Sequence, residues 1–575
     1  MDITIRIGGA AGQGLQSIGS ALTALLAREG YHVFSHQNYM SRIRGGHNFY
    51  QIRLADRPLA ASREKVDILV ALDRETIDRH HATLSNHGLV ISDQESLKEE
   101  FAEKHYLNVP AVRLTKEAGI NKIMANSVTI GALLSGLGLG LDSFNEVIRQ
   151  ALSKKGEDII EDNLEAARLG RDHINNQGGW PRELKAGKSK PGELRILSGN
   201  QGIGYGALVS GCRFYSAYPM TPSTGIMIYL AAKAQKHGIV VEQAEDEIAA
   251  INMAIGASFG GVRAMTGTSG GGFALMNEGL SLAGITETPL VIAEVQRPGP
   301  ATGLPTRTEQ GDLLFVLHAG HGEFAKVLMA PGHPAQAVEL TNRAFELAEK
   351  YQIPVIVQSD QYLADSEWTY TELNTDNLQY QDHRLRQENQ IPANYKRYAL
   401  NNSGISPLAV PGKGEGLVVA DSDEHDEEGH IIEDAETRTK MVEKRLSSKM
   451  VSLKEEIRPP ELYGSEKPRV ILAGFGSTYG IMREAVDNLA EREEIACLHF
   501  AELWPFPGTD EFDFLAILKE AKLAICVENN ISGQFARLIR AETGFSFSAS
   551  IRKYDGRPFL LEPFLGEIDE HLKRI

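Results

Sequence analysis

Cysteine is scarce in this sequence of 575 residues, which contains only Cys212, Cys497 and Cys526. The three lie far apart, and no CxxC pair occurs. Disulfide-stabilised small proteins and four-cysteine iron–sulfur clusters both need more cysteines than this, in closer spacing. The composition therefore excludes a disulfide scaffold and argues against an iron–sulfur cluster within the chain.

Positive charge is also in short supply, because 59 Lys and Arg residues face 76 Asp and Glu residues, for a net charge of −17. Proteins that bind nucleic acid neutralise phosphates with basic surfaces, so we expect no nucleic-acid partner. A content of 42% hydrophobic and 23% charged residues is typical of a globular protein. The length predicts three or four domains of about 150 residues each.

Long hydrophobic runs are missing as well. Two uncharged windows, residues 123–141 and 214–232, are long enough to consider as membrane spans. The first contains polar residues and four glycines, and the second contains two prolines. Buried core is the better interpretation of both windows, because a membrane helix needs about 20 predominantly apolar residues. The chain does not start with a signal peptide, so we expect a cytoplasmic protein with no membrane partner.

The N-terminal region begins with a predicted strand at residues 3–7 and the glycine loop GGAAGQG at 8–14, which opens a predicted helix from Leu15. Such loops let backbone N–H groups approach a phosphate at a helix N-terminus. A dinucleotide site would also need an acid about 20 residues further on, and its absence counts against NAD. Strand-like segments at 66–72 and 88–92 complete what we expect to be an open parallel α/β sheet.

Cationic side chains gather in the segment SRIRGGH, where Arg42, Arg44 and His47 surround two glycines. Arginine offers paired donors that suit phosphate. Together with Gly12 and Gly14, these residues are candidates for holding a ligand with several negative charges. A solvated strand–turn–strand is the alternative.

A second α/β unit contains the most constrained stretch, YPMTPST at 218–224. Pro219 and Pro222 fix the backbone on both sides of Thr221, so this side chain is rigidly held. The next predicted strand leads to an acidic cluster made of Glu242, Glu245, Asp246 and Glu247. A carboxylate near a helix N-terminus gains a few tenths to about 1 kcal/mol, which is sufficient to account for Glu242 and Glu245.

Two later motifs in this unit also suggest a ligand site. The glycines 270–272 permit the close approach of a ligand or another subunit, although tight helix packing explains them equally well. Arg297 follows the predicted strand 289–295. Open α/β sheets bind ligands beyond the carboxyl ends of their strands, where an arginine binds a carboxylate through two parallel hydrogen bonds. A structural salt bridge is the alternative for Arg297.

The remaining chain is harder to interpret. The acidic run 421–430 contains two histidines, but its spacing matches no metal geometry and we expect a solvated loop. Residues 438–454 predict a helix of mixed charge. A third α/β alternation follows from residue 469. In it, 528–530 and 533–534 either contact a ligand or partner, or cap the end of a strand.

Taken together, these motifs resemble the 2-oxoacid:ferredoxin oxidoreductases. YPMTPST, the acid that begins an Ala/Gly-rich helix, TGTSGGGFALMNEG and EVQRPGPATGLPTRTEQGD are similar to the alpha subunit, and GGAAGQG with SRIRGGH is similar to the gamma domain, which some members fuse ahead of alpha. The resemblance implies three open α/β domains. They are a Rossmann-like gamma domain (1–180), a thiamine diphosphate pyrimidine-binding domain (195–370) and a transketolase C-terminal-like domain (466–575), joined by a linker (181–194) and an irregular connecting segment (371–465).

The family reaction implied by this resemblance is the reversible oxidative decarboxylation of a 2-oxoacid with coenzyme A. Glu247 is then expected to bind the pyrimidine N1′ of thiamine diphosphate, and Thr221 and Arg297 to hold the 1-carboxylate of the substrate. The resemblance also assigns contacts with thiamine diphosphate to Tyr218 and Pro219. It assigns contacts with coenzyme A to Gly12, Gly14, Arg42, Arg44 and His47.

The chain lacks the GDG motif with which this family places Mg²⁺ and the diphosphate. The resemblance therefore implies a separate beta subunit that carries Mg²⁺, the diphosphate site and a [4Fe–4S] cluster, in an (αβ)2 assembly that reduces ferredoxin. Three features look most like the 2-oxoglutarate members of the family: the fused gamma–alpha order and the segments RPGPATGLPT and EHDEEGHIIED. Arg307 or His318 is then the candidate to bind the second carboxylate of 2-oxoglutarate. Pyruvate or a branched-chain 2-oxoacid is the alternative substrate, and a non-catalytic coenzyme A-binding subunit is the alternative function.

Overall fold

The computed structural model describes residues 1–41, 45–153, 155–178, 187 and 189–574. The chain forms two compact units, which we describe separately. Unit 1 comprises Met1–Leu197, Ser366–Leu373 and Leu560–Leu565, and unit 2 comprises Ser198–Asp365, Asn374–Phe559 and Gly566–Ile575. The finer division into five segments stays a prediction, and half of the expected linker, residues 181–186 and 188, lies outside the described residues.

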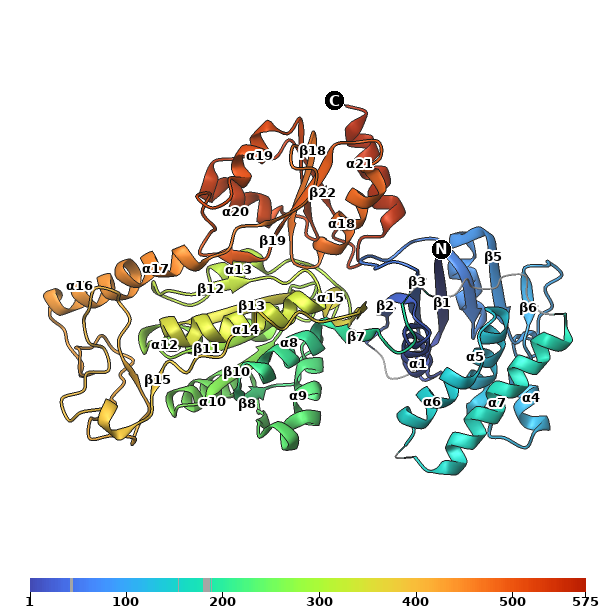
Figure 1. Ribbon diagram of the computed structural model, residues 1–575, viewed down its shortest axis with the longest axis horizontal. Coiled ribbons are helices and arrows are strands. Elements are labelled where there is room, and N and C mark those ends of the chain that lie inside the picture. Colours follow the sequence, from blue (N-terminus) through green and yellow to red (C-terminus); the bar gives the residue numbers. More distant parts are fainter. Residues whose placement is uncertain (42–44, 154, 179–186, 188, 575) are drawn as a thin grey trace. The chain divides into compact units, whose positions relative to one another are not determined.

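Unit 1 is built on an eight-stranded sheet in the order β6-β5-β4-β1-β3-β2-β14-β7 (Figure 1). Its strands are β1 (Asp2–Ala10), β2 (His32–Asn38), β3 (His47–Ala55), β4 (Val66–Ala71), β5 (Leu84–Ser92), β6 (Tyr106–Asn108), β7 (Arg195–Ser198) and β14 (Glu367–Tyr370). The late segment β14 pairs with β2, so residues far apart in the sequence complete one sheet.

The expectation of a parallel sheet in this region is wrong for half of it. Strands β1, β4, β5 and β6 are parallel, as expected. Strand β3, however, is antiparallel to both β1 and β2. Strand β2 ends at Asn38 and β3 begins at His47, and a connection this short can join only antiparallel strands.

The helices of unit 1 are α1 (Leu15–Arg28), α2 (Arg74–His80), α3 (Gln94–Leu97), α4 (Ala111–Glu117), α5 (Ala125–Gly136), α6 (Asp142–Ala151) and α7 (Glu157–Asn176). The apolar window 123–141 forms α5, which packs in the core against α7. A Cβ on Gly170 would lie 1.8 Å from the carbonyl oxygen of Val128, so only glycine permits this approach. Among the described residues, no helix is both long and apolar enough to cross a membrane.

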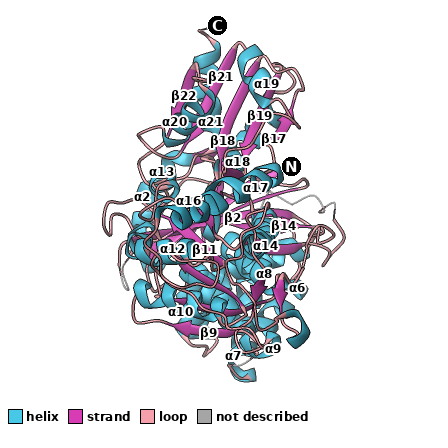
Figure 2. Cartoon of the chain, turned by 90° about the vertical axis from the view of Figure 1, so that its left-hand side faces the viewer, coloured by secondary structure: helices cyan, strands magenta, loops and turns pink. Residues whose placement is uncertain are grey.

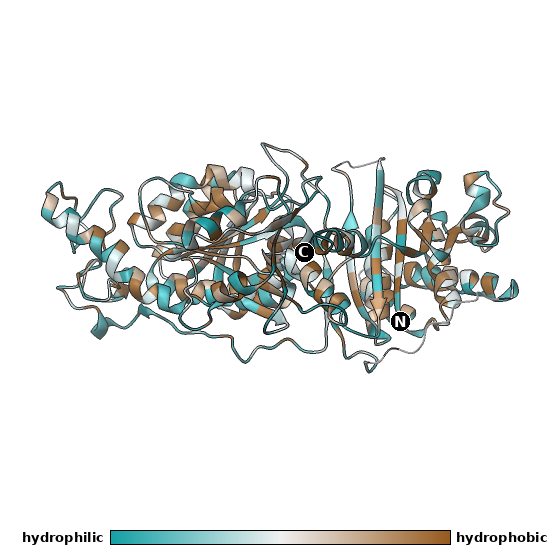
Figure 3. Ribbon diagram, turned by 90° about the horizontal axis from the view of Figure 1, so that it is seen from above, coloured by the Kyte–Doolittle hydropathy of each residue, from teal (hydrophilic) through white to brown (hydrophobic). Residues whose placement is uncertain are grey.

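Unit 2 contains a seven-stranded sheet in the order β20-β12-β13-β11-β10-β8-β9. Its members are β8 (Cys212–Ala217), β9 (Val240–Gln243), β10 (Arg263–Thr268), β11 (Leu290–Gln296), β12 (Val327–Met329), β13 (Pro354–Asp360) and β20 (Glu502–Trp504). All neighbours are parallel except β20, which runs antiparallel to β12. Hydrophobic residues dominate the strands, as Figure 3 shows. The inner strands β10, β11 and β13 are buried on both faces, as parallel sheets require, whereas the edge strand β9 is largely exposed.

Helices cover both faces of this sheet (Figure 1). They are α8 (Gly199–Val209), α9 (Thr224–His237), α10 (Glu247–Phe259), α11 (Gly270–Leu275), α12 (Asn277–Ile285), α13 (Leu313–Leu317), α14 (Pro334–Tyr351) and α15 (Gln361–Asp365). One core lies between the sheet and α8, α9 and α14. The other joins α10, α12 and α13 to the C-terminal part of the chain.

The C-terminal part of unit 2 is a five-stranded sheet in the order β17-β19-β18-β21-β22, flanked by helices (Figure 2). Its elements are β17 (Glu461–Gly464), β18 (Val470–Phe475), β19 (Ile495–Phe500), β21 (Leu523–Glu528), β22 (Ala549–Arg552), α18 (Thr478–Leu489), α19 (Phe514–Glu520), α20 (Gln534–Thr543) and α21 (Leu561–Leu572). The fold class is thus α/β, as predicted.

The sequence allowed two roles for residues 528–534, contact with a ligand or the capping of a strand end, and the contacts in the structure are structural. Glu528 accepts hydrogen bonds from the backbone N–H groups of Phe535 and Ala536 at the start of α20. Asn529 exchanges backbone and side-chain hydrogen bonds with Gln310, which lies just before α13. These contacts join the C-terminal sheet to the larger sheet of unit 2.

The connecting segment contains β15 (Arg384–Leu385), β16 (Leu408–Ala409), α16 (Ala435–Glu443), a π-helical turn (Lys444–Ser448) and α17 (Lys449–Glu456). The expectation of a solvated acidic loop at 421–430 is wrong in part. His425 is fully buried, with its ring centroid 4.0 Å from that of Tyr398. Glu424 accepts two hydrogen bonds from Arg445. Burial of His425 against Tyr398 and the hydrogen bonds from Arg445 of the mixed-charge helix therefore fix the middle of this loop.

Candidate functional site

Glu247 is the first residue of α10, and its carboxylate is almost completely buried, with 3% of the residue exposed. The preceding residue, Asp246, is the N-cap and accepts the N–H of Ala249 at 2.7 Å. Because the cap is already made, the Glu247 carboxylate is not needed for it. Its Oε1 has no hydrogen-bond partner within the described part of the protein. Glu242 and Glu245 are exposed, which is consistent with carboxylates that interact only with the nearby helix N-terminus.

The three glycines make room for two carboxylates. A Cβ on Gly272 would lie 2.4 Å from Glu247 Oε1 and 2.1 Å from Thr268 Oγ1. A Cβ on Gly270 would lie 2.1 Å from Asp312 Oδ2. Real Cβ atoms do not approach oxygen so closely, so side chains at these positions would displace the carboxylates. Gly272 is therefore needed to accommodate the Glu247 carboxylate, and Gly270 is needed to accommodate that of Asp312.

Thr221 and Arg297 lie together, although 76 residues separate them. Arg297 follows β11, and its Nη1 donates a hydrogen bond of 2.7 Å to the Thr221 carbonyl oxygen. Asn200 supports the same turn by donating to the carbonyl oxygen of Pro222. Partial burial lowers the pKa of Arg297. A guanidinium has five N–H donors, so Arg297 is able to hold the turn and to bind a carboxylate as well.

The other residues predicted for this region are Tyr218, Pro219, Arg307 and His318. Tyr218 is exposed and Pro219 is half-buried, ahead of the Thr221 turn. Arg307 is buried beside Gly556, where a Cβ on the glycine would lie 3.3 Å from Arg307 Cβ. His318 follows α13 and lines a separate cavity with Lys326. Their roles in binding remain predictions.

A buried acid next to this site, Glu294, was not among the residues predicted from the sequence. Glu294 of β11 is fully buried, and its Oε1 has no hydrogen-bond partner in the described part of the chain. Gln358 of β13 donates to its Oε2 at 3.2 Å. Burial raises the pKa of Glu294 well above 4.5, and the Asp312 and Asp360 carboxylates add to this. Burial also raises the pKa of Asp312 to about 6.

The sequence carried one signal for Glu294. Within the apolar strand LVIAEVQ, acidic and amide side chains alternate at its carboxyl end. A polar residue inside a strand buried on both faces is costly unless it has a function or a partner. Only the structure shows that Thr268 and Gln358 lie opposite Glu294 on the neighbouring strands.

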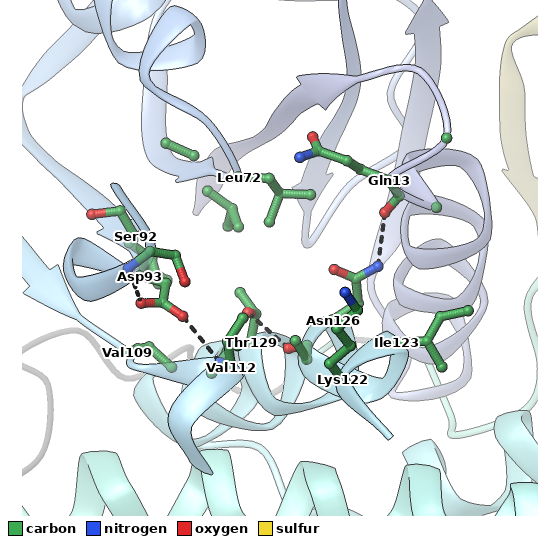
Figure 4. A pocket seen from close by; sticks show the side chains of 18 of the residues that line it. Gln13, Leu72, Ser92, Asp93, Val109, Val112, Lys122, Ile123, Asn126 and Thr129 are labelled. Carbon is green, nitrogen blue, oxygen red and sulfur yellow. Dashed lines mark hydrogen bonds between the residues drawn. The ribbon is translucent and has the colours of Figure 1, made fainter. Parts of the chain in front are cut away.

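Unit 1 contains a second candidate site, a cavity of about 680 Å³ at the carboxyl ends of β1, β4 and β5 (Figure 4). The glycine loop forms one wall, where Gly12 and Gly14 adopt positive φ angles of 94° and 75°. Asn126 of α5 donates to the Gln13 carbonyl oxygen at 2.8 Å and holds the loop. Asp93 lies across the cavity from Gln13, and Lys122 and Thr129 also line the cavity.

His47 has a different environment. It is buried, and its Nε2 lies 2.7 Å from Nε2 of His80, whose Nδ1 lies 2.9 Å from Arg6 Nη1. Burial lowers the pKa of His47. His47 is the first residue of β3 and does not line the cavity of unit 1. A direct contact between His47 and a ligand in this cavity is therefore not supported. Arg42 and Arg44 lie outside the described residues.

Comparisons with known proteins agree with this geometry. The family model "Pyruvate flavodoxin/ferredoxin oxidoreductase, thiamine diP-bdg" matches residues 205–444, and "Pyruvate ferredoxin/flavodoxin oxidoreductase" matches residues 4–173. The 2-oxoacid:ferredoxin oxidoreductase subunit alpha of Sulfolobus sp is 34% identical over 99% of this chain and 96% of its own. The 2-oxoglutarate oxidoreductase subunit KorA of Mycobacterium tuberculosis is 29% identical over 98% and 90% of the two chains.

One solved structure matches along the whole chain. It is the 2-oxoglutarate:ferredoxin oxidoreductase from Magnetococcus marinus with 2-oxoglutarate, coenzyme A and succinyl-CoA bound. It superimposes with a TM-score of 0.90 and 32% identity, and covers 99% of each chain.

We expect Glu294→Gln to stabilise unit 2 more at high pH than at low pH. An unfolded Glu294 releases its proton near a pKa of 4.5, whereas burial raises this pKa in the folded protein. Stability of the wild-type protein therefore falls as the pH rises above that value, and the glutamine variant lacks this loss. Melting temperatures measured by calorimetry at about pH 5 and about pH 8 should show an advantage of the variant that grows by at least about 2 °C. Exposed Glu245→Gln is the control, and an equal advantage at both pH values would contradict the assignment.

Proposed function

Since the chain belongs to the family of 2-oxoacid:ferredoxin oxidoreductase alpha subunits, we propose that it forms part of a 2-oxoglutarate:ferredoxin oxidoreductase. The reaction would be the reversible oxidative decarboxylation of 2-oxoglutarate with coenzyme A to succinyl-CoA, CO2 and reduced ferredoxin. The observation that supports this most strongly is the buried, unpartnered Oε1 of Glu247 at the start of α10.

The residues around Glu247 fit the aminopyrimidine ring of thiamine diphosphate. The orphaned Oε1 provides one hydrogen-bonding atom, and Gly272 leaves the space beside it free of a side chain. When bound, thiamine diphosphate supplies the carbanion chemistry that releases CO2 from a 2-oxoacid. In this proposal Glu247 holds or shares a proton with N1′ of the ring, and Tyr218 and Pro219 contact the cofactor from the preceding turn.

The turn at Thr221 fits the 1-carboxylate of the substrate. Thr221 and Arg297 are joined by a hydrogen bond and present a hydroxyl and a guanidinium from one place. A carboxylate held by both would have its charge and its orientation fixed. Arg307 is our candidate for the second carboxylate of 2-oxoglutarate. The matched KorA and Magnetococcus proteins, named for 2-oxoglutarate, support this choice over pyruvate or a branched-chain 2-oxoacid.

The cavity of unit 1 is our proposed site for part of coenzyme A. Backbone N–H groups at Gly12 and Gly14 precede α1, where a phosphate is favoured by the helix N-terminus. Lys122 adds a cationic side chain to the lining of the cavity. Arg42, Arg44 and His47 keep their predicted role in this proposal.

The outer side of α10 supports the need for a second subunit. Apart from Glu247, this helix of 13 residues has no charged side chain. Ile248 and Met253 are nevertheless 50% and 41% exposed, next to Gly256. A helix that is apolar on its exposed side is usually covered by another chain. We propose that a beta subunit covers it and carries the diphosphate site, Mg²⁺ and a [4Fe–4S] cluster, in a cytoplasmic (αβ)2 assembly.

A reduction assay tests this function. The chain, purified with its co-expressed beta subunit, should reduce ferredoxin or methyl viologen in the presence of coenzyme A, with 2-oxoglutarate as the preferred substrate over pyruvate and 2-oxoisovalerate. Preference for another oxoacid would contradict the substrate assignment alone. A complex that contains its cofactors and reduces no acceptor would contradict the catalytic proposal.

We expect Glu247→Gln to lower the turnover number of this complex by at least about 100-fold, because general acid–base groups typically contribute 10²- to 10⁴-fold. The exposed Glu245→Gln should leave the turnover number within about twofold. Full activity of Glu247→Gln would favour a non-catalytic, coenzyme A-binding subunit, and would contradict the role of Glu247.

Met253→Asp should weaken binding of the beta subunit by at least about tenfold, because it would bury a carboxylate in an apolar interface. The isolated chain should keep its melting temperature, since Met253 is exposed there. Mass photometry of the co-expressed complex measures the assembly. Leu417→Asp is the matched control, as Leu417 is 80% exposed in the connecting segment; equal effects of the two variants would contradict the proposed interface.

A further inference from the structure

Unit 2 contains a cavity of about 750 Å³ that the proposed reaction does not use. It lies between α13 with the following loop, α17 of the connecting segment, the Trp504–Phe506 turn and α20 of the C-terminal part. A volume of this size suits a small organic ligand. Its apolar wall is formed by Leu314, Leu317, Phe324, Leu446, Met450, Trp504, Pro505, Phe506 and Leu538.

Lys326 is the buried cation of this cavity. Only 9% of the residue is exposed, and its ammonium donates one hydrogen bond of 2.6 Å to the carbonyl oxygen of Ala319. The ammonium also lies 4.9 Å from the ring centroid of Phe324. No carboxylate of the described chain forms an ion pair with it. A buried charge without a counter-ion is costly, and an anion in the cavity would remove that cost.

The mouth of the cavity has both signs of charge. Lys454 of α17 and Arg537 of α20 are exposed there, as is His318. Glu323 and Glu542 provide negative charge at the same rim. Glu323 and Glu542 are exposed to water, whereas Lys326 is buried. Charges interact more strongly where water is excluded, so Lys326 has the larger effect on a ligand inside the cavity. The interior therefore favours an anion.

We propose that this cavity binds a small organic anion, with its carboxylate or phosphate on the Lys326 ammonium and its apolar body against Leu317, Trp504 and Leu538. The required ligand is amphipathic, because a fully hydrated anion would gain nothing from the apolar wall. The cavity is lined by none of Thr221, Glu247, Arg297 and Arg307, and His318 at its rim is the one candidate substrate residue that it shares. Its occupation links α13, α17 and α20, which come from three different parts of unit 2.

Calorimetric titration of the full chain with 4-phenylbutyrate and with phenyl phosphate tests this site, with the uncharged 4-phenylbutanol as the matched ligand. We expect each anion to bind at least about tenfold more tightly than the alcohol, as hydrogen bonds to charged groups contribute about 1.5–3 kcal/mol. Lys326→Met should abolish this preference, whereas the exposed Lys522→Met should keep it. Binding of the alcohol should be unchanged in both variants.

Two further measurements distinguish binding in this cavity from binding elsewhere on the chain. Burial lowers the pKa of Lys326 to about 8, so affinity for the anions should fall as the pH rises through that value, because the ammonium loses its charge. Ala541→Trp, at the exposed rim, should block both the anions and the alcohol without a change in the core.

Equal affinity for acid and alcohol, or an unchanged preference in Lys326→Met, would overturn the proposal. Loss of anion binding on addition of the beta subunit would also overturn it, because that subunit would then cover or fill the cavity in the assembled protein. Activity towards 2-oxoacids does not enter these measurements, so the result is independent of the proposed reaction.

Discussion

The central constraint on unit 2 is a buried carboxylate oxygen, Oε1 of Glu247, with no hydrogen-bond partner among the described residues. Burial of an unpaired acceptor costs about 1–3 kcal/mol of stability. The described residues around it provide no donor that would remove this cost. Asp246 caps α10 in place of Glu247, and Gly272 leaves the adjacent space without a side chain. The rest of α10 is uncharged, so no lysine or arginine of this helix is available to pair with the carboxylate.

A second feature of unit 2 is the concentration of acids behind this site. Glu294, Asp312 and Asp360 approach one another at the carboxyl ends of β11 and β13 and at the start of α13, and each has a raised pKa. Such a cluster reduces stability, and proteins retain costly polar groups mainly where function requires them. The link between Gln310 and Asn529 fixes the start of α13 against the C-terminal sheet. The C-terminal part thus helps to position Asp312, which is distant from it in sequence.

Local motifs draw attention to Thr221, Glu247 and Arg297 but not to their surroundings, and the role expected of Glu247 comes from the family resemblance. Two prolines around Thr221 and the acid-headed apolar helix of Glu247 carry their signals within a few residues, and Arg297 follows a recognisable strand. The meeting of Arg297 with Thr221 depends on the strand order of the sheet, which no local pattern specifies. Lys326 looks ordinary in sequence, and Glu294 is marked only by the polar alternation at the end of its strand. Burial without a counter-charge distinguishes both residues, and only the structure shows it. The antiparallel β3 was missed because a short connection, rather than a pattern of hydrophobic residues, sets its direction. The Asp421–His430 loop was judged by its charge, whereas contacts with Tyr398 and Arg445 fix its middle and bury His425.

The most direct test of the central claim is a cryo-electron microscopy structure of the chain with its co-expressed beta subunit and thiamine diphosphate. The account predicts the aminopyrimidine ring within hydrogen-bond distance of Glu247, beside Gly272, with the diphosphate and its metal held by the second subunit across the apolar side of α10. A cofactor bound entirely by the other subunit, with Glu247 still unpartnered, would contradict the account.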